Sequence, residues 1–177
     1  VSALNINGGT CTVSGNLIFT GTNATATRIG RIDVTTGSLT LDGTITWMAN
    51  TVSATESIRT TGTGSLTFNS AVTMGDASGT IAATSTGTIN FNATPTALTF
   101  GGTTAPVLTS TSGCTINFNG SLTAATTALT FIAGSNVVFT GSGTITPTSV
   151  ITFNNFQINS AVAVTLAGNI IVAGNWV

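Results

Sequence analysis

The stretch Thr88–Gly101, TINFNATPTALTFG, contains the pattern that decides the fold. Ile89 and Phe91 alternate with asparagines, and after a turn-like break Leu98 and Phe100 alternate with a threonine. A period of two residues is typical of half-buried β-strands. The stretch therefore predicts two short strands, each with one apolar and one polar face.

The same phrase of alternating residues followed by a turn residue recurs along the chain. It is found at Leu39–Gly43, Leu66–Ser70, Ile116–Gly120, Val137–Gly141 and Ile151–Asn155. One short strand phrase that repeats with a turn residue at a fixed place indicates a solenoid, in which each coil stacks on the one before it.

The apolar residue that closes each phrase is expected to form one column in the core. The predicted members are Leu41, Phe68, Phe91, Phe118 and Phe139, with spacings of 27, 23, 27 and 21 residues. Each coil thus holds roughly two dozen residues, and its length varies because insertions at the corners lie outside the stacked core.

The residue after the column is most often asparagine, which can bend the backbone and bond to the coil above. We expect a structural corner ladder at Asp42, Asn69, Asn92, Asn119 and Asn154.

These patterns predict an all-β fold with almost no helix. The expected architecture is a right-handed parallel β-solenoid, or β-helix, of about seven coils that occupies residues 1–177 as a single domain. A β-sandwich, in which neighbouring strands run antiparallel, is the main alternative architecture. The fixed phrase favours the solenoid, because strands of a sandwich differ from place to place.

Composition narrows the possible functions. Only 4% of residues are charged and the net charge is -1, whereas binding to nucleic acid depends on clustered Lys and Arg. No apolar stretch reaches the ~18 residues of a membrane helix. We therefore expect neither nucleic-acid binding nor membrane insertion.

The charged side chains do not suggest an active site. There is no histidine, and the four acids are scattered over different coil positions, so the chain is predicted not to be an enzyme and to hold no metal or cofactor. The charges are expected to be either solvated or locally paired, Arg31 with Asp33 and Glu56 with Arg59.

Cys11 and Cys114 each have the same parity along the strand as neighbouring apolar residues that are expected to face inward. If about four coils separate them, a spacing of ~4.8 Å per coil places them far beyond disulfide reach. Both are expected to be small buried thiols, with a cross-link between subunits as the alternative.

Outward threonines allow a second kind of function. The triplet Thr-x-Thr occurs at several places, among them Thr10–Thr12 and Thr144–Thr146, and flat threonine ladders are known from solenoid proteins that bind ice. Threonine is also the ordinary outward residue of a strand that stays soluble without charge, and the triplets do not fall at one coil position.

The last third of the chain carries a resemblance. Asn154–Phe156, Val164–Asn169 and Val172–Asn175 resemble repeat phrases of bacterial extracellular β-solenoid proteins of the filamentous-haemagglutinin and autotransporter-adhesin type. The likeness covers about residues 135–177, and the rest follows only the general pattern. It implies export, display at the cell surface and a binding or structural role.

The ends of the predicted solenoid suggest how it acts. Neither a helix nor a charged loop is expected to cover the edge strands, so the chain is either a piece of a longer repeat protein or a subunit that stacks head to tail on copies of itself. We expect a structural subunit of an extracellular filament, with a fragment of a secreted adhesin that binds surface glycans and an ice-binding protein as alternatives. The expected subunit contact consists of Val1, Leu4, Ile6, Ile171, Trp176 and Val177.

Overall fold

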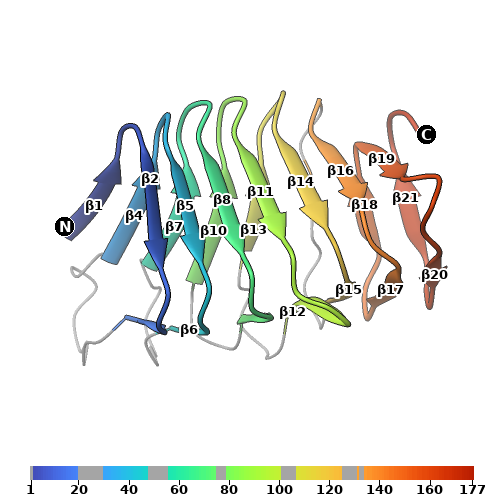
Figure 1. The fold of residues 1–177 in the computed structure, drawn as a ribbon. Helices are drawn as coiled ribbons and strands as arrows, with labels where there is room; N and C mark the ends of the chain where they lie inside the picture. Colours follow the sequence, from blue (N-terminus) through green and yellow to red (C-terminus); the bar gives the residue numbers. More distant parts are fainter. Residues whose placement is uncertain are drawn as a thin grey trace.

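The computed structural model describes residues 2–19, 30–47, 56–74, 79–100, 107–124, 131 and 134–177. Within these ranges every regular element is a β-strand and none is a helix. Every pair of neighbouring strands that hydrogen-bond is parallel, and the strands form a stack from the N-terminus to the C-terminus (Figure 1). The chain is a β-solenoid, as its sequence predicts, and the antiparallel sandwich is excluded.

Three sheets form the sides of the solenoid. The first sheet has five strands: β1 (Ser2–Ile6), β4 (Gly30–Val34), β7 (Glu56–Thr60), β10 (Gly79–Ala83) and β13 (Val107–Ser110). The second sheet has seven: β2 (Thr10–Val13), β5 (Ser38–Leu41), β8 (Ser65–Phe68), β11 (Thr88–Phe91), β14 (Thr115–Phe118), β16 (Asn136–Phe139) and β19 (Asn155–Ile158). The third has five: β9 (Val72–Met74), β12 (Thr96–Phe100), β15 (Ser121–Ala124), β17 (Gly143–Pro147) and β20 (Val164–Leu166).

Two short pairs complete the described strands. They are β3 (Leu17–Ile18) with β6 (Ile45–Thr46), and β18 (Ile151–Phe153) with β21 (Ile170–Val172).

The solenoid makes about five turns of about 25 residues, fewer than the seven predicted. Among the described strands, the first and third sheets contain five strands each, and only the second contains seven. The coils also shorten toward the C-terminus: 27 residues separate Asn90 from Asn117, but only 19 separate Asn136 from Asn155. The phrase at Ile151–Phe153 lies in the short β18–β21 pair, outside the three main sheets.

Alternation along each strand builds the core. In β8, β11 and β14 the second and fourth residues are buried, and those between them are half-exposed. In-register pairing then places like residues over one another, so that Phe68, Phe91, Phe118 and Phe139 stack with ring centroids 5.0, 5.1 and 5.3 Å apart. Stacked rings and branched aliphatic side chains fill the interior along its length.

Candidate functional site

The predicted core column lies on one line of the second sheet. Leu41 pairs with Phe68, Phe68 with Phe91, Phe91 with Phe118, and Phe118 with Phe139. Each of these side chains is at most 1% exposed. The column is therefore interior structure, with no surface to offer a ligand.

The corner ladder runs beside this column for four coils. Asn69 Nδ2 donates to Asp42 Oδ1 at 2.7 Å, and Asn92 Nδ2 donates to Asn69 Oδ1 at 3.0 Å. Asn119 Nδ2 then donates to the backbone oxygen of Asn92 at 3.2 Å. Because the amides bond to one another, their polar atoms tie coil to coil.

Asn154 does not belong to this ladder. It follows β18, at the corner before the second sheet, where its Oδ1 accepts from the backbone N–H of Gly134 at 2.6 Å. Ile158 is the residue that pairs with Phe139, so Asn159 takes the place after the column. The short last coils cause the shift, since a single residue separates β18 from β19.

A second amide ladder, which the sequence reading missed, lies on the outer face of the second sheet. Asn90 Nδ2 donates to Thr67 Oγ1 at 3.2 Å, and Asn117 Nδ2 donates to Asn90 Oδ1 at 2.8 Å. A separate pair lies in the neighbouring outward column, nearer the C-terminus, where Asn155 Nδ2 donates to Asn136 Oδ1 at 3.0 Å and Asn136 pairs with Thr115. The repeated TINFN phrase could have indicated this ladder. Its first asparagine alternates with the inward residues, so it faces outward at the same place in each copy of the phrase.

Three charged residues meet on the first sheet. Asp33 is 6% exposed, and Arg59 Nε donates to its Oδ1 at 2.5 Å. Arg31 Nε lies 2.8 Å from Oδ2, as an ion pair without hydrogen-bond alignment. The expected Arg31–Asp33 pair is thus present, and Arg59 joins it because pairing of β4 with β7 sets Asp33 beside Arg59. The side chain of Glu56 lies outside the described residues.

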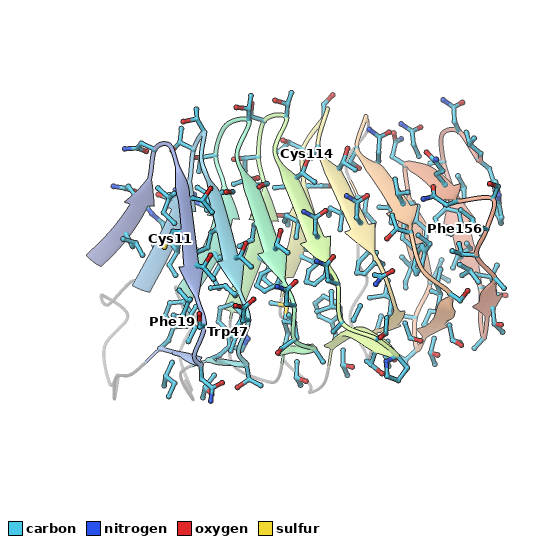
Figure 2. The ribbon with its side chains drawn as sticks, in the orientation of Figure 1. Cys11, Phe19, Trp47, Cys114 and Phe156 are labelled. Carbon is cyan, nitrogen blue, oxygen red and sulfur yellow. The ribbon has the colours of Figure 1, made fainter. Side chains whose placement is uncertain are left out.

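Both cysteines are free thiols. Cys11 is half-buried on β2 near the N-terminal end, and Cys114 is buried at a corner in the middle of the stack (Figure 2). The Cys114 thiol donates to the backbone oxygen of Ser85 at 2.5 Å. No described group of three or more His, Cys, Asp or Glu side chains could hold a metal ion.

The tryptophans occupy different settings. Trp47 stacks on Phe19 with ring centroids 5.3 Å apart and planes inclined by 7°. A Cβ on Gly79 would come within 2.6 Å of the Trp47 ring, so this ring is packed between coils. Trp176 is 57% exposed and makes an edge contact with Phe156, 5.3 Å between centroids.

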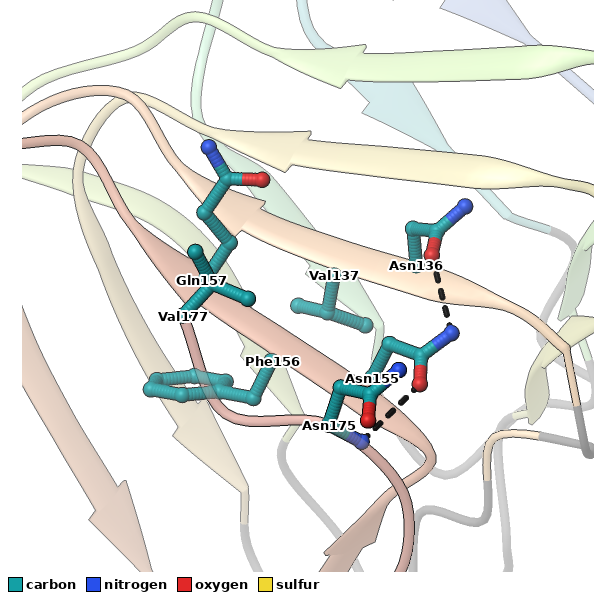
Figure 3. A pocket seen from close by; sticks show the side chains of 7 residues that line it. All are labelled: Asn136, Val137, Asn155, Phe156, Gln157, Asn175 and Val177. Carbon is teal, nitrogen blue, oxygen red and sulfur yellow. Dashed lines mark hydrogen bonds between the residues drawn. The ribbon is translucent and has the colours of Figure 1, made fainter.

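A cavity of about 120 Å³ opens near the C-terminal end (Figure 3). Asn136, Asn155, Phe156, Asn175 and Val177 contribute to its lining. Its volume is well below the ~300 Å³ of small-molecule sites and is enough for a few water molecules. Its polar wall extends the Asn136–Asn155 pair, since the Asn175 N–H donates to Asn155 Oδ1 at 3.1 Å.

The described members of the predicted subunit contact lie at opposite ends of the stack. Leu4 is 52% exposed on β1, whereas Ile171, Trp176 and Val177 are exposed at the C-terminal end. Ile6 is buried at 7%, because inward pairing with Val34 places it in the core, so it cannot present its side chain to a partner. Val1 lies outside the described residues.

The exposed apolar residues at the ends include the last described members of core columns. Leu4 pairs with the buried Ile32, Leu166 with the buried Ile145, and Trp176 with the buried Phe156. The end coils therefore present inward-type residues to solvent, and they are the candidate functional surfaces of the described chain.

No helix in the described part of the chain has the length and apolar character needed to cross a membrane. No family model, curated protein or solved structure matches this chain.

Proposed function

We propose that the protein is a structural subunit of an extracellular filament, in which solenoids stack head to tail. One observation carries the proposal: three core columns reach the end coils with their last described members exposed. Leu4 is 52% exposed, Leu166 41% and Trp176 57%, while their neighbours one coil inward are at most 6% exposed. A further coil would bury these side chains, and each fully buried large apolar side chain is worth about 1.5–3 kcal/mol.

The chemistry of the end strands supports the same function. Edge strands of soluble proteins are usually protected by charges, prolines or covering segments. The sequences of β1, β2, β20 and β21 contain no charged residue and no proline. The two strands at the N-terminal end are also edge strands of their sheets.

Stacking of a second copy would reuse an interface that the protein already makes internally. Every described coil contacts the next through parallel in-register strands. Two different ends meet in such a contact, and a head-to-tail contact that does not close into a ring produces a fibre. The extracellular location is supported by the resemblance of residues 135–177 to secreted surface repeats.

Negative-stain microscopy of the purified protein tests the proposal. A filament subunit gives unbranched fibres of uniform width whose number rises with protein concentration. Protein that stays monomeric at the highest soluble concentration contradicts it. A monomer that binds glycan-coated surfaces identifies a surface adhesin instead.

A column of threonines supports ice binding as a second candidate. Thr73, Thr99, Thr123 and Thr146 pair in register on the third sheet. Their spacing of about 4.8 Å produces a regular row of hydroxyl and methyl groups. Thermal hysteresis of monomeric protein, abolished by Thr99→Lys, is the expected result for this function.

A further inference from the structure

One inward column of the second sheet runs from the first described coil to the last. It contains Cys11, Leu39, Leu66, Ile89, Ile116, Val137, Phe156 and Trp176. Its smallest side chain stands at the N-terminal end and its largest at the C-terminal end. Cys11 is half-buried and Trp176 is 57% exposed, so both ends of the column are accessible.

Backbone direction at the C-terminal end determines which atoms can meet a further strand. The Phe156 N–H donates to the oxygen of Asn175 at 2.8 Å, and the Val177 N–H donates to the oxygen of Phe156 at 3.0 Å. Asn175 and Val177 thus direct their backbone groups back toward β19. Because successive residues of a strand point to opposite edges, Trp176 directs its N–H and C=O away from β19, toward the edge that no described strand covers.

The N-terminal end has the complementary arrangement. The oxygens of Gly9 and Val13 accept from Ser38 and Asp42 of the next coil, at 2.9 and 3.0 Å. Thr10 and Thr12, which alternate with these residues, therefore direct their backbone groups toward the opposite edge of β2, where the described chain has no strand. In a parallel ladder, one residue bonds to the two residues that flank its partner. Trp176 would bond to Thr10 and Thr12, and its partner would then be Cys11.

We propose that copies of this chain join with Trp176 of one copy opposite Cys11 of the next. This register rests on the proposed filament function and makes it specific. It is the one that satisfies the backbone direction of both edges and also keeps the inward column continuous. The small Cys11 side chain leaves room for the indole ring, which becomes buried at the joint.

Cysteine cross-linking tests this register. Trp176→Cys in a Cys114→Ser background leaves Cys11 and the new cysteine as the two thiols of the chain. Paired residues on neighbouring parallel strands are about 4.8 Å apart, within the range of Cα separations of disulfides. Under an added mild oxidant, which takes up two electrons as two thiols lose their protons, the variant should form covalent oligomers on a non-reducing gel.

Val177→Cys in the same background is the matched control. Its side chain has the opposite parity and should leave the chain monomeric on the gel. Equal cross-linking by both variants, or cross-linking by Val177→Cys alone, overturns the register.

A second measurement keeps both Cys11 and Trp176 and follows the reactivity of the Cys11 thiol. In the Cys114→Ser variant, Cys11 should react with a maleimide in the monomer and lose that reactivity in filaments. Filaments in which Cys11 stays reactive overturn the joint while leaving filament assembly intact. Absence of filaments under all conditions contradicts the proposed function itself.

Discussion

Phe91 and Phe118 lie face to face in neighbouring coils, with ring centroids 5.1 Å apart and planes inclined by 6°. Both side chains are at most 1% exposed, and each also stacks on a further Phe, Phe91 on Phe68 and Phe118 on Phe139. A ring in this column thus supports the coil on either side of it, and removal of one ring affects two interfaces.

Phe118→Ala should lower the free energy of unfolding by about 3–5 kcal/mol, because the cavity lies between two rigid rings and cannot collapse. Urea unfolding followed by circular dichroism measures the change. Thr73→Ala, on an exposed side chain of β9, is the control and should remain within about 0.5 kcal/mol of the parent protein. Equal effects of the two substitutions would contradict the stacked core.

Gly37→Ala should destabilise the protein by about 1–3 kcal/mol, since overpacking forces the backbone to shift. A Cβ at Gly37 would lie 2.6 Å from the Gly9 backbone oxygen of the preceding coil. Gly8 is the matched control, because a Cβ there meets nothing within 4 Å. Thermal unfolding of Gly37→Ala and Gly8→Ala should separate a close approach between coils from the general effect of replacing glycine.

Asp33→Asn should lower stability by about 1–3 kcal/mol, because Arg31 and Arg59 lose their shared carboxylate while their side chains stay about two-thirds buried. Urea unfolding at low and high salt measures this loss of stability. The difference in stability between Asp33→Asn and the parent protein should shrink at high salt, because salt screens the charges. Asp42→Asn is the control. Asp42 is exposed and accepts from Asn69, which an amide oxygen can also do, so a small change is expected. A larger loss for Asp42→Asn would show that the charge cluster is not a stabilising contact.

Leu4→Lys should prevent filament formation without unfolding the solenoid. Leu4 is half-exposed at the end of a core column, and a buried charge without a partner at the joint costs several kcal/mol. Thr73→Lys places the same charge on the side of the stack and should leave assembly unchanged. Sedimentation and negative-stain microscopy measure assembly, and circular dichroism verifies the fold. Filaments of Leu4→Lys would exclude this end as the joint.

Much of the fold could be predicted from the pattern of neighbouring residues in the sequence. Alternation in the phrase around Phe91 and Phe118 predicts which side chains point inward, and the recurrence of one phrase indicates parallel, in-register stacking, which is confirmed. Parity depends only on neighbouring residues of one strand, so it can be read locally.

Two wrong predictions, the place of Asn154 and the number of turns, share one cause. Asn154 follows the same phrase as Asn119 but lies at another corner, and the count of seven turns exceeds the five observed. Which side of the solenoid a strand occupies depends on the length of every corner before it, and a local phrase does not record that length.

By itself the sequence determined the period of two, the parallel coils and the inward Phe column, because these follow from side-chain alternation and from the identity of repeated residues. Only the tertiary structure decided that Arg59 pairs with Asp33, that Ile6 is buried while Leu4 is exposed, and that Trp176 ends the column that begins at Cys11. These relationships depend on which coil lies beside which, and that is set by the path of the whole chain around the core.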